Sequence, residues 1–270
     1  MRRSPFAMRV LPAALTLLAA LPLHAAPRTI FRDDFASFDA RRWIVEAEPA
    51  SASASVSGAA SAPDSAPDSA PDSAPDSSPS AKASVRSHLQ PPPVYTDKHA
   101  LVLDSARGLT VWLDRRLTGH YEIAYTRTVL DAGGPHDRVS DLNQFWLASA
   151  RGSNGRVAPF GGSGRFEDYD ALDLFYAGVG GNGNTTTRFR HYDGTSARPL
   201  LAQYTSPSRL LRANHAYRVR IVVDGRGTRF YLDGKPYFAA SPPLPEAGWF
   251  GFRSTASRQT IRDFTIRALP

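Results

Sequence analysis

Cysteine is absent from the 270 residues of this chain, which excludes disulfides, thiol chemistry and lipid attachment through a cysteine. Beyond the N-terminal region, no apolar run is long enough to span a membrane as a helix. The histidines and aspartates lack the spacing of zinc sites or EF-hands, and no helical period exceeds two turns. These absences favour a β-protein stabilised by packing, with no cofactor indicated. A structural calcium ion, which β-sandwiches often carry, is not indicated by the sequence either.

The N-terminus has the composition of an export signal. Three arginines precede an apolar run from Val10 to Leu23, which ends in the small residues Ala25 and Ala26. This layout predicts that residues 1–26 are a secretory signal peptide, too short for a spanning helix. We therefore expect a soluble secreted or periplasmic protein that is not a lipoprotein.

A low-complexity stretch interrupts the rest of the chain. Residues 50–90 are rich in Ala, Ser, Pro and Asp, and APDS is repeated four times from Ala62 to Ser77. Such a composition cannot bury enough apolar surface to become ordered. The short segment before it is too small to fold alone. We therefore predict one domain over residues 27–270, with 50–90 as a disordered insertion in a loop.

The charge is positive, with a net value of +7 that comes mostly from arginine. Arginine forks match carboxylate, sulfate and phosphate groups. No helical basic stripe or nucleic-acid-binding motif accompanies them, so nucleic acid is not the expected partner. An acidic polysaccharide or oligosaccharide fits better outside the cytoplasm, whereas nothing in the sequence specifies an oligomeric state.

The residues after the insertion follow a rhythm of short strands and turns. His120 to Leu130 alternates apolar and polar residues, and Asp224-Gly225 joins two alternating segments, Tyr217 to Val223 and Arg229 to Leu232. Frequent Gly and Pro turns without a βαβ rhythm predict an all-β fold, an antiparallel β-sandwich.

Several segments resemble known domains. Phe230 to Tyr237 (FYLDGKPY) and Gly248 to Ile266 resemble the closing strands of concanavalin-like jelly rolls, and Asp33 to Trp43 resembles their first strand. Asp137 to Trp146 (DRVSDLNQFW) and Gly178 to Gly194 (GVGGNGNTTTRFRHYDG) resemble an exported bacterial family of concanavalin-like domains of unknown function. The resemblance implies a jelly roll related in fold to laminin-G-like domains, glucanases and polysaccharide lyases. It implies no particular reaction.

The candidate site begins in the stretch Asp170 to Gly194. If Phe189 faces the core, the opposite face of its strand carries Thr186, Arg188, Arg190 and Tyr192. A Gly-rich loop before this strand adds the amides of Asn182 and Asn184. A bare loop beside a row of guanidinium donors suits a ligand with hydroxyl or carboxylate groups, although a solvated polar sheet face has the same pattern.

Two neighbouring strands extend the candidate site. With Phe145 and Leu147 in the core, Gln144 and Trp146 would face the concave side, next to Leu174 and Tyr176. Trp146 would stack on a sugar ring or else pack in the core. The expected substrate-binding residues are Asn143, Gln144, Trp146, Asn182, Asn184 and Arg190.

These residue types suit β-elimination on a uronate-containing glycan. Arg188 would neutralise the carboxylate. Of the two tyrosines, Tyr176 and Tyr192, one would take the carbon-bound proton and the other would protonate the leaving oxygen, and neighbouring arginines would lower the pKa of a phenol. We therefore expect a polysaccharide lyase with Tyr176, Tyr192 and Arg188 as catalytic residues.

Two alternatives stay open. A non-catalytic carbohydrate-binding sandwich would need the same arginine, amide and aromatic groups. A glycoside hydrolase would need two carboxylates, which Asp168, Asp170 and Asp173 could supply because they match the spacing of Glu-x-Asp-x-x-Glu in glucanases. These aspartates could equally be turn residues.

Overall fold

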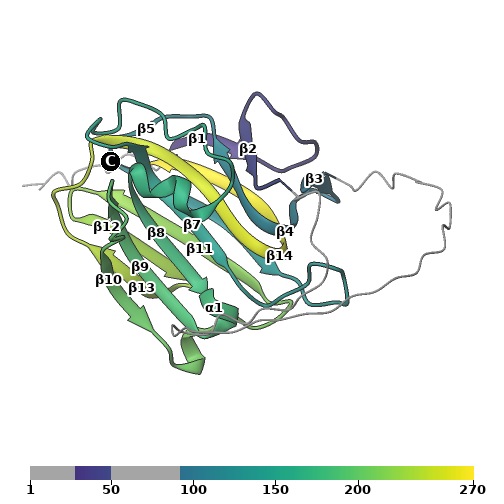
Figure 1. Cartoon of the computed structure of the whole chain (residues 1–270). Coiled ribbons are helices and arrows are strands. Elements are labelled where there is room, and N and C mark those ends of the chain that lie inside the picture. Colours follow the sequence, from purple (N-terminus) through teal and green to yellow (C-terminus); the bar gives the residue numbers. More distant parts are fainter. Residues whose placement is uncertain (1–27, 50–91) are drawn as a thin grey trace, which may run out of the picture.

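The computed structural model describes residues 28–49 and 92–270, so the predicted signal peptide and the predicted insertion lie outside the described residues. The described residues form an antiparallel β-sandwich, as predicted (Figure 1). Its strands are β1 (Arg28–Asp33), β2 (Trp43–Ala47), β3 (Val94–Asp97), β4 (Ala100–Leu113), β5 (Leu117–Thr118), β6 (Tyr121–Val129), β7 (Leu142–Ala150), β8 (Leu172–Gly180), β9 (Thr186–Asp193), β10 (Leu200–Tyr204), β11 (Ala216–Asp224), β12 (Gly227–Leu232), β13 (Lys235–Ala240) and β14 (Ala247–Ala268). The short helices are η1 (Phe166–Ala171), α1 (Gly181–Asn184) and η2 (Pro207–Arg209).

The long strands β4 and β14 belong to both layers. In the front sheet, the order β10-β9-β8-β7 continues into the first part of β14, then into β4 and β2. In the back sheet, the order β13-β12-β11-β6 continues into the last part of β14, which also pairs with β1 and β4. Between these parts the register of β14 shifts and Ala256 has a φ of 46°, the signature of a bulge that bends a strand.

The segment before residue 50 adds strands to this sandwich. β1 pairs with β14, and β2 pairs with β4, although residues 50–91 separate them from β3 in the sequence. Trp43 of β2 is buried against Phe252 and Phe264, and its indole Nε1 donates to Asp33 Oδ2 at 2.9 Å. The first strands therefore share the core of the later ones.

An aromatic stack fills the core between the sheets. The indole of Trp146 is fully buried and stacked between Phe175, Phe189 and Phe230, with ring centroids 5.8 to 6.3 Å away. Its Nε1 donates to Thr228 Oγ1 at 2.8 Å. The prediction that Trp146 faces a sugar on the concave side is therefore wrong.

Gln144 shares the face of Trp146 and is equally buried. Its Oε1 accepts a hydrogen bond from the Tyr125 hydroxyl at 2.9 Å, and its Nε2 donates to the Ala177 carbonyl at 2.6 Å. The predicted substrate contact of Gln144 is wrong too, since both ends of the amide are used within the core. The error has one cause: β7 is buried on both faces, so its alternation did not reveal which face is the core. Phe145 lies on the outer face, and a register shift after Trp146 turns Leu147 into the core.

A buried guanidinium joins the two sheets. Arg127 of β6 in the back sheet has no exposed surface, and burial lowers its pKa to about 10. Its Nη1 donates to the Asn143 carbonyl at 2.7 Å and its Nη2 to the Arg253 carbonyl at 2.9 Å, both in the front sheet. Its Nε donates to Gln259 Oε1 at 2.7 Å. A buried cation of this kind is tolerated because each of its nitrogen atoms has an acceptor.

The loop before β7 depends on one carboxylate. Asp137 accepts bonds from the backbone NH groups of Ala132 and Gly134, at 2.7 and 2.9 Å, and pairs with Arg258 of β14 through both of its oxygens. Burial alone would raise the pKa of Asp137, but the hydrogen bonds from Arg258, Gly134 and Ala132 outweigh it and hold the pKa at about 2.

We expect Asp137→Ala to lower the free energy of unfolding by about 2–3 kcal/mol, because it removes a buried carboxylate and leaves the Arg258 guanidinium and two backbone NH groups without their acceptor. The folded pKa lies below the usual value of 3.8, so the contribution is complete above about pH 4 and is lost as the pH falls towards 2. Urea unfolding of both proteins at pH 7 and pH 2.5 measures the difference. The control is Asp131→Ala, which removes an exposed carboxylate from the same loop. Equal destabilisation at the two pH values would contradict this assignment.

Candidate functional site

A cleft of about 450 Å³ opens on the outer face of the front sheet, near α1. It is lined by Arg138, Asp141, Asn143, Phe166, Tyr176, Gly178, Gly181, Asn182, Gly183, Thr186, Arg188, Arg190, Arg198 and Thr255. Five predicted site residues therefore share one cleft, namely Asn143, Tyr176, Asn182, Arg188 and Arg190.

The base of the cleft contains a glycine at the centre of three paired strands. Asn143 of β7, Gly178 of β8 and Arg188 of β9 lie opposite one another in register. Because Gly178 has no side chain, the Tyr176 hydroxyl lies over it, where a Cβ atom would otherwise be, and close to the Asn143 amide. In the next row, Tyr176 lies opposite Arg190. Phe189, between the two arginines, is buried in the core, as its alternation predicted.

Two guanidinium groups give the cleft its excess positive charge. The Arg188 Nε donates to Gln203 Oε1 at 2.7 Å, and the Arg190 Nη1 donates to the Arg198 carbonyl. Within the described ranges, neither of them forms an ion pair. These neutral partners orient the guanidinium groups while leaving their charges uncompensated.

The other two arginines of the cleft are neutralised. Arg138 pairs with Asp141 at 2.8 Å, and Arg198 pairs with Asp170 through two nitrogens. The Arg198 guanidinium also lies 4.6 Å from the centre of the Phe166 ring. The sequence analysis did not predict that the cleft is also lined by Arg138, Asp141, Phe166 and Arg198. The polar turn directly before Asn143 is the signal that could have indicated Arg138 and Asp141.

Tyr176 presents a hydroxyl group without a partner among the described residues. Its side chain is 7% exposed, and burial raises its pKa, outweighing the opposing effect of Arg253 and Arg190. Neighbouring arginines do act to lower this pKa, as expected, but burial has the larger effect, so the net direction is opposite to the one a catalytic base needs. A phenol that stays protonated is a hydrogen-bond donor or a general acid rather than a base.

Tyr192 and Asn184 do not line the cleft. Tyr192 has no exposed surface, with Phe166 packed against its ring, and burial raises its pKa as well. The predicted catalytic contact of Tyr192 is wrong because η1 covers it, a tertiary contact that strand alternation does not reveal. The Asn184 amide instead binds the backbone of Leu211 on both sides, at 2.8 and 2.9 Å. Asn182 is exposed at the rim, with the left-handed φ of 53°.

The aspartate cluster does not form a catalytic strand. Asp168 and Asp170 lie in η1, and only Asp173 is in β8. Asp168 accepts two bonds from Ser163, which lower its pKa. Asp170 pairs with Arg198, and Asp173 accepts a bond from the Gly152 NH at 2.7 Å. Turn chemistry and ion pairing, in line with one of the two interpretations of the sequence, thus account for all three carboxylates.

The segment between β7 and β8, residues 151–171, covers the rest of the outer face. Its aromatic residues Phe160, Phe166 and Tyr169 pack on Trp112, Phe145 and Tyr176. Glu46 of β2 holds the segment down. Its Oε1 accepts bonds from the Gly161 and Gly162 NH groups, and its Oε2 accepts from the Trp112 indole and the Tyr169 hydroxyl, all at 2.7 to 2.9 Å.

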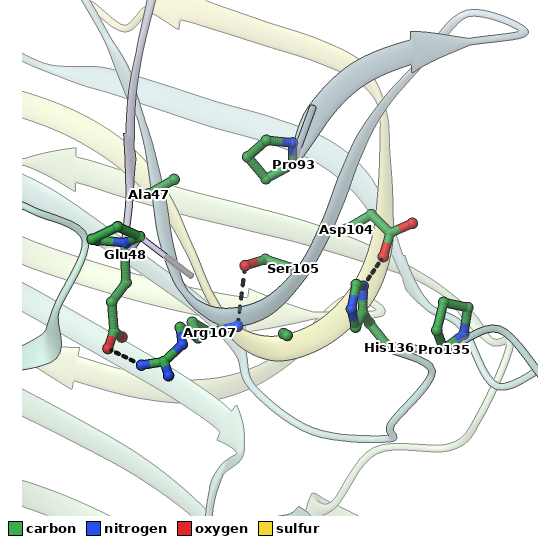
Figure 2. Close-up of a pocket in the computed structure, with 10 residues that line it drawn as sticks. Ala47, Glu48, Pro93, Asp104, Ser105, Arg107, Pro135 and His136 are labelled. Carbon is green, nitrogen blue, oxygen red and sulfur yellow. Dashed lines mark hydrogen bonds and ion pairs between the residues drawn. The ribbon is translucent and has the colours of Figure 1, made fainter. Parts of the chain in front are cut away.

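A second cleft, of about 480 Å³, lies where residues 47–49 and 93 approach the bend of β4 (Figure 2). Its polar groups are already paired with one another. The His136 Nδ1 lies 2.7 Å from Asp104 Oδ1, and the Arg107 Nη1 donates to Glu48 Oε1 at 2.9 Å. The cleft beside Arg188 therefore offers more uncompensated charge to a ligand.

The described ranges contain no candidate metal site, because no three or more His, Asp or Glu side chains lie close enough together to hold an ion. Asp141 and Asn143 come nearest in chemistry, but the Asp141 carboxylate already accepts bonds from Arg138, Ser140 and Asn143. The helices in the same ranges are all too short or too polar to cross a membrane.

The fold is that of a galectin-like or concanavalin-like jelly roll. A Bacillus subtilis protein of unknown function with a galectin-like fold has a TM-score of 0.50 and 14% identity, covering 63% of this chain and 83% of its own. Residues 103–264 match a family described as Domain of unknown function (DUF6250), and the chain belongs to this family. The resemblance of the sequence to a family of unknown function with a concanavalin-like fold is thus confirmed.

Two further solved structures are more distant. The carbohydrate-binding module CBM66 from Bacillus subtilis has a TM-score of 0.43 and 12% identity, covering 62% of this chain and 86% of its own. An endo-β-1,3-glucanase from Pyrococcus furiosus has a TM-score of 0.46 and 9% identity, covering 66% and 78%. A search of curated proteins gives no match. Likeness at these identities shows the fold alone.

We expect Glu46→Ala to release the covering segment, because four donors lose their acceptor, two of them in buried hydrogen bonds. The free energy of unfolding should fall by at least about 2 kcal/mol, and limited proteolysis should cut within residues 160–169 faster than in the wild type. Glu167→Ala, which removes an exposed carboxylate from the same segment, is the control and should change neither. Unchanged protease resistance in Glu46→Ala would show that aromatic packing alone holds the segment.

Proposed function

We propose that this protein binds an acidic saccharide in the cleft beside α1. The observation that carries the proposal is the pair Arg188 and Arg190, two oriented guanidinium groups without carboxylate partners in the described ranges that line an open cleft of about 450 Å³. Guanidinium forks bind carboxylate and sulfate groups through charge-assisted hydrogen bonds. The anionic group of the ligand would lie between these two side chains.

The remaining groups of the cleft suit a ligand that also carries hydroxyls. The Tyr176 hydroxyl, the Asn143 and Asn182 amides and the Thr186 side chain surround the arginines. The Phe166 ring supplies an apolar surface at the border of the cleft. Cations interleaved with amides and hydroxyls fit a sugar acid better than an apolar anion. The predicted export of the chain remains a prediction, and it would place the cleft where such glycans occur.

We expect Arg188→Ala to weaken binding of an acidic glycan about 30- to 150-fold, because one charge-assisted fork contributes about 2–3 kcal/mol. Isothermal titration against oligouronates, sulfated oligosaccharides and neutral glucans measures the effect. Binding should also weaken as salt rises. The control is Arg218→Ala, which removes an exposed arginine from β11 of the back sheet. If the wild type binds none of the acidic ligands, the proposed function is wrong.

A second candidate function, β-elimination on a uronate, is favoured by the Tyr176 hydroxyl, which lies on the residue opposite Arg190 and has no hydrogen-bond partner among the described residues. A protonated phenol could donate a proton to the leaving oxygen while the arginines neutralise the carboxylate. The described lining of the cleft contains no histidine, and burial raises the pKa of Tyr176, which makes this phenol a poor base. Binding without cleavage therefore fits the geometry better.

We expect Tyr176→Phe to separate the two functions. If the protein is a lyase, this variant abolishes the absorbance of unsaturated products while affinity for the same oligouronate changes only a few-fold. If it is a binding protein, neither the wild type nor the variant forms product. Product formation that persists in Tyr176→Phe would move the chemistry to another group.

A glycoside hydrolase is the least suited to this site. Hydrolysis requires two carboxylates flanking the scissile bond. Asp141 is the single carboxylate among the described residues that line the cleft, and it is paired with Arg138.

A further inference from the structure

The amide of Asn143 has a nitrogen that forms a hydrogen bond and an oxygen that has no partner among the described residues. This side chain is 2% exposed at the border of the cleft, and its Nδ2 donates to Asp141 Oδ1 at 3.2 Å. Its Oδ1 is buried and has no hydrogen-bond partner among the described residues. A buried carbonyl oxygen without a donor is unfavourable, so a donor supplied by a ligand would bind there.

Asp141 fixes which end faces the cleft. A carboxylate only accepts hydrogen bonds, so the Asn143 NH₂ group must point towards it. The reverse orientation would place two acceptor oxygens against each other. Asp141 is itself held in place, since its Oδ2 accepts from Ser140 Oγ at 2.6 Å and from the Arg138 Nη2 at 2.8 Å. Its φ of 63° is in the left-handed region, which Asp and Asn tolerate better than most residues.

The unused oxygen shares its space with the Tyr176 hydroxyl. Gly178 lies opposite Asn143, and a Cβ atom at this glycine would be 2.9 Å from Asn143 Oδ1 and would collide with the Tyr176 hydroxyl. An acceptor without a donor and a hydroxyl without a partner in the described ranges thus converge over one glycine. Arg188, opposite Gly178 on the other side, places a cation next to them.

We infer that Asp141 is a positioning residue that makes the base of the cleft specific for a hydroxyl group next to the anionic group of the ligand. This inference rests on the proposed saccharide binding. The ligand hydroxyl accepts a bond from the Tyr176 hydroxyl and donates its own proton to Asn143 Oδ1. A sugar acid with a free hydroxyl meets both requirements. A fluorine or a methoxy group at that position accepts but cannot donate.

The substitution Asp141→Asn tests the role of Asp141 with little change in shape. Ser140 and Arg138 donate to one side of residue 141 and would keep an amide oxygen there. The NH₂ group of the substituted side chain would then face Asn143 and reverse its amide, so that the Asn143 NH₂ points into the cleft. Selectivity for a donating ligand group should disappear, although the residues that bind the anion are unchanged.

The experiment uses the full chain and the oligouronate that binds the wild type best. Its affinity is compared with those of analogues in which each hydroxyl in turn is replaced by fluorine. We expect the wild type to lose at least about tenfold in affinity at one position, which corresponds to about 1.4 kcal/mol, and Asp141→Asn to lose less than about threefold there, because only the wild type loses a hydrogen bond to a buried acceptor. Asp131→Asn, which changes an exposed carboxylate in the same loop, should keep the preference of the wild type.

Asn143→Ala provides a second measurement if Asp141→Asn does not fold. It removes the acceptor, so the preference for hydroxyl over fluorine should vanish in this variant as well. If the wild type binds oligouronates, and fluorine substitution weakens binding as much in Asp141→Asn and Asn143→Ala as in the wild type, the inference is wrong but the proposed function stands. A wild type that binds no acidic saccharide overturns the proposed function and the inference together.

Discussion

The guanidinium of Arg127 is the interaction on which the arrangement of the two sheets and the cleft depends. It reaches from the back sheet to backbone carbonyls of β7 and β14 in the front sheet, and one of these carbonyls belongs to Asn143 at the border of the cleft. A buried cation is costly unless its donors are satisfied, so only one relative position of these strands accommodates it. The same contact that joins the layers therefore also fixes the strand that carries Asn143.

The cleft lies between the edge of the covering segment and the part of the front sheet around Gly178. Residues 151–171 fill the outer face over Trp112, Phe145 and Tyr176, held by Glu46 below and by the pairing of Asp170 with Arg198 at the edge. Beyond that edge, the Tyr176 hydroxyl lies over Gly178 next to Asn143, and Arg188 lies opposite Gly178 on the other side. The covering segment uses up the carboxylates near the site in its own turns and ion pairs. Arg188 and Arg190 remain uncompensated within the described ranges, and this excess charge favours an anionic ligand in the cleft.

The correct and incorrect parts of the sequence analysis differ in how strongly one face of each strand is marked. On β9, apolar Phe189 between two arginines indicated the core face, and both arginines lie in the cleft. On β7, the residues from Leu142 to Ala150 are buried on both sides, so assigning Phe145 to the core was wrong by one position and placed Trp146 and Gln144 on the wrong face. The placement of Tyr192 was wrong for another reason: its face was correct, but η1 lies over it.

The sequence was enough to predict the β-sandwich, since short alternating strands separated by Gly, Pro and Asp-Gly turns restrict the chain to that class. It also determined that Arg188 and Arg190 share a face, because alternation is a local property of a strand. The pairing of carboxylates with arginines depends on the tertiary structure. So does the pKa of Tyr176, which burial raises although neighbouring arginines act to lower it. Ion pairing and desolvation depend on residues distant in sequence, such as Asp170 with Arg198 and Glu46 with Gly161, and no local pattern records these distances.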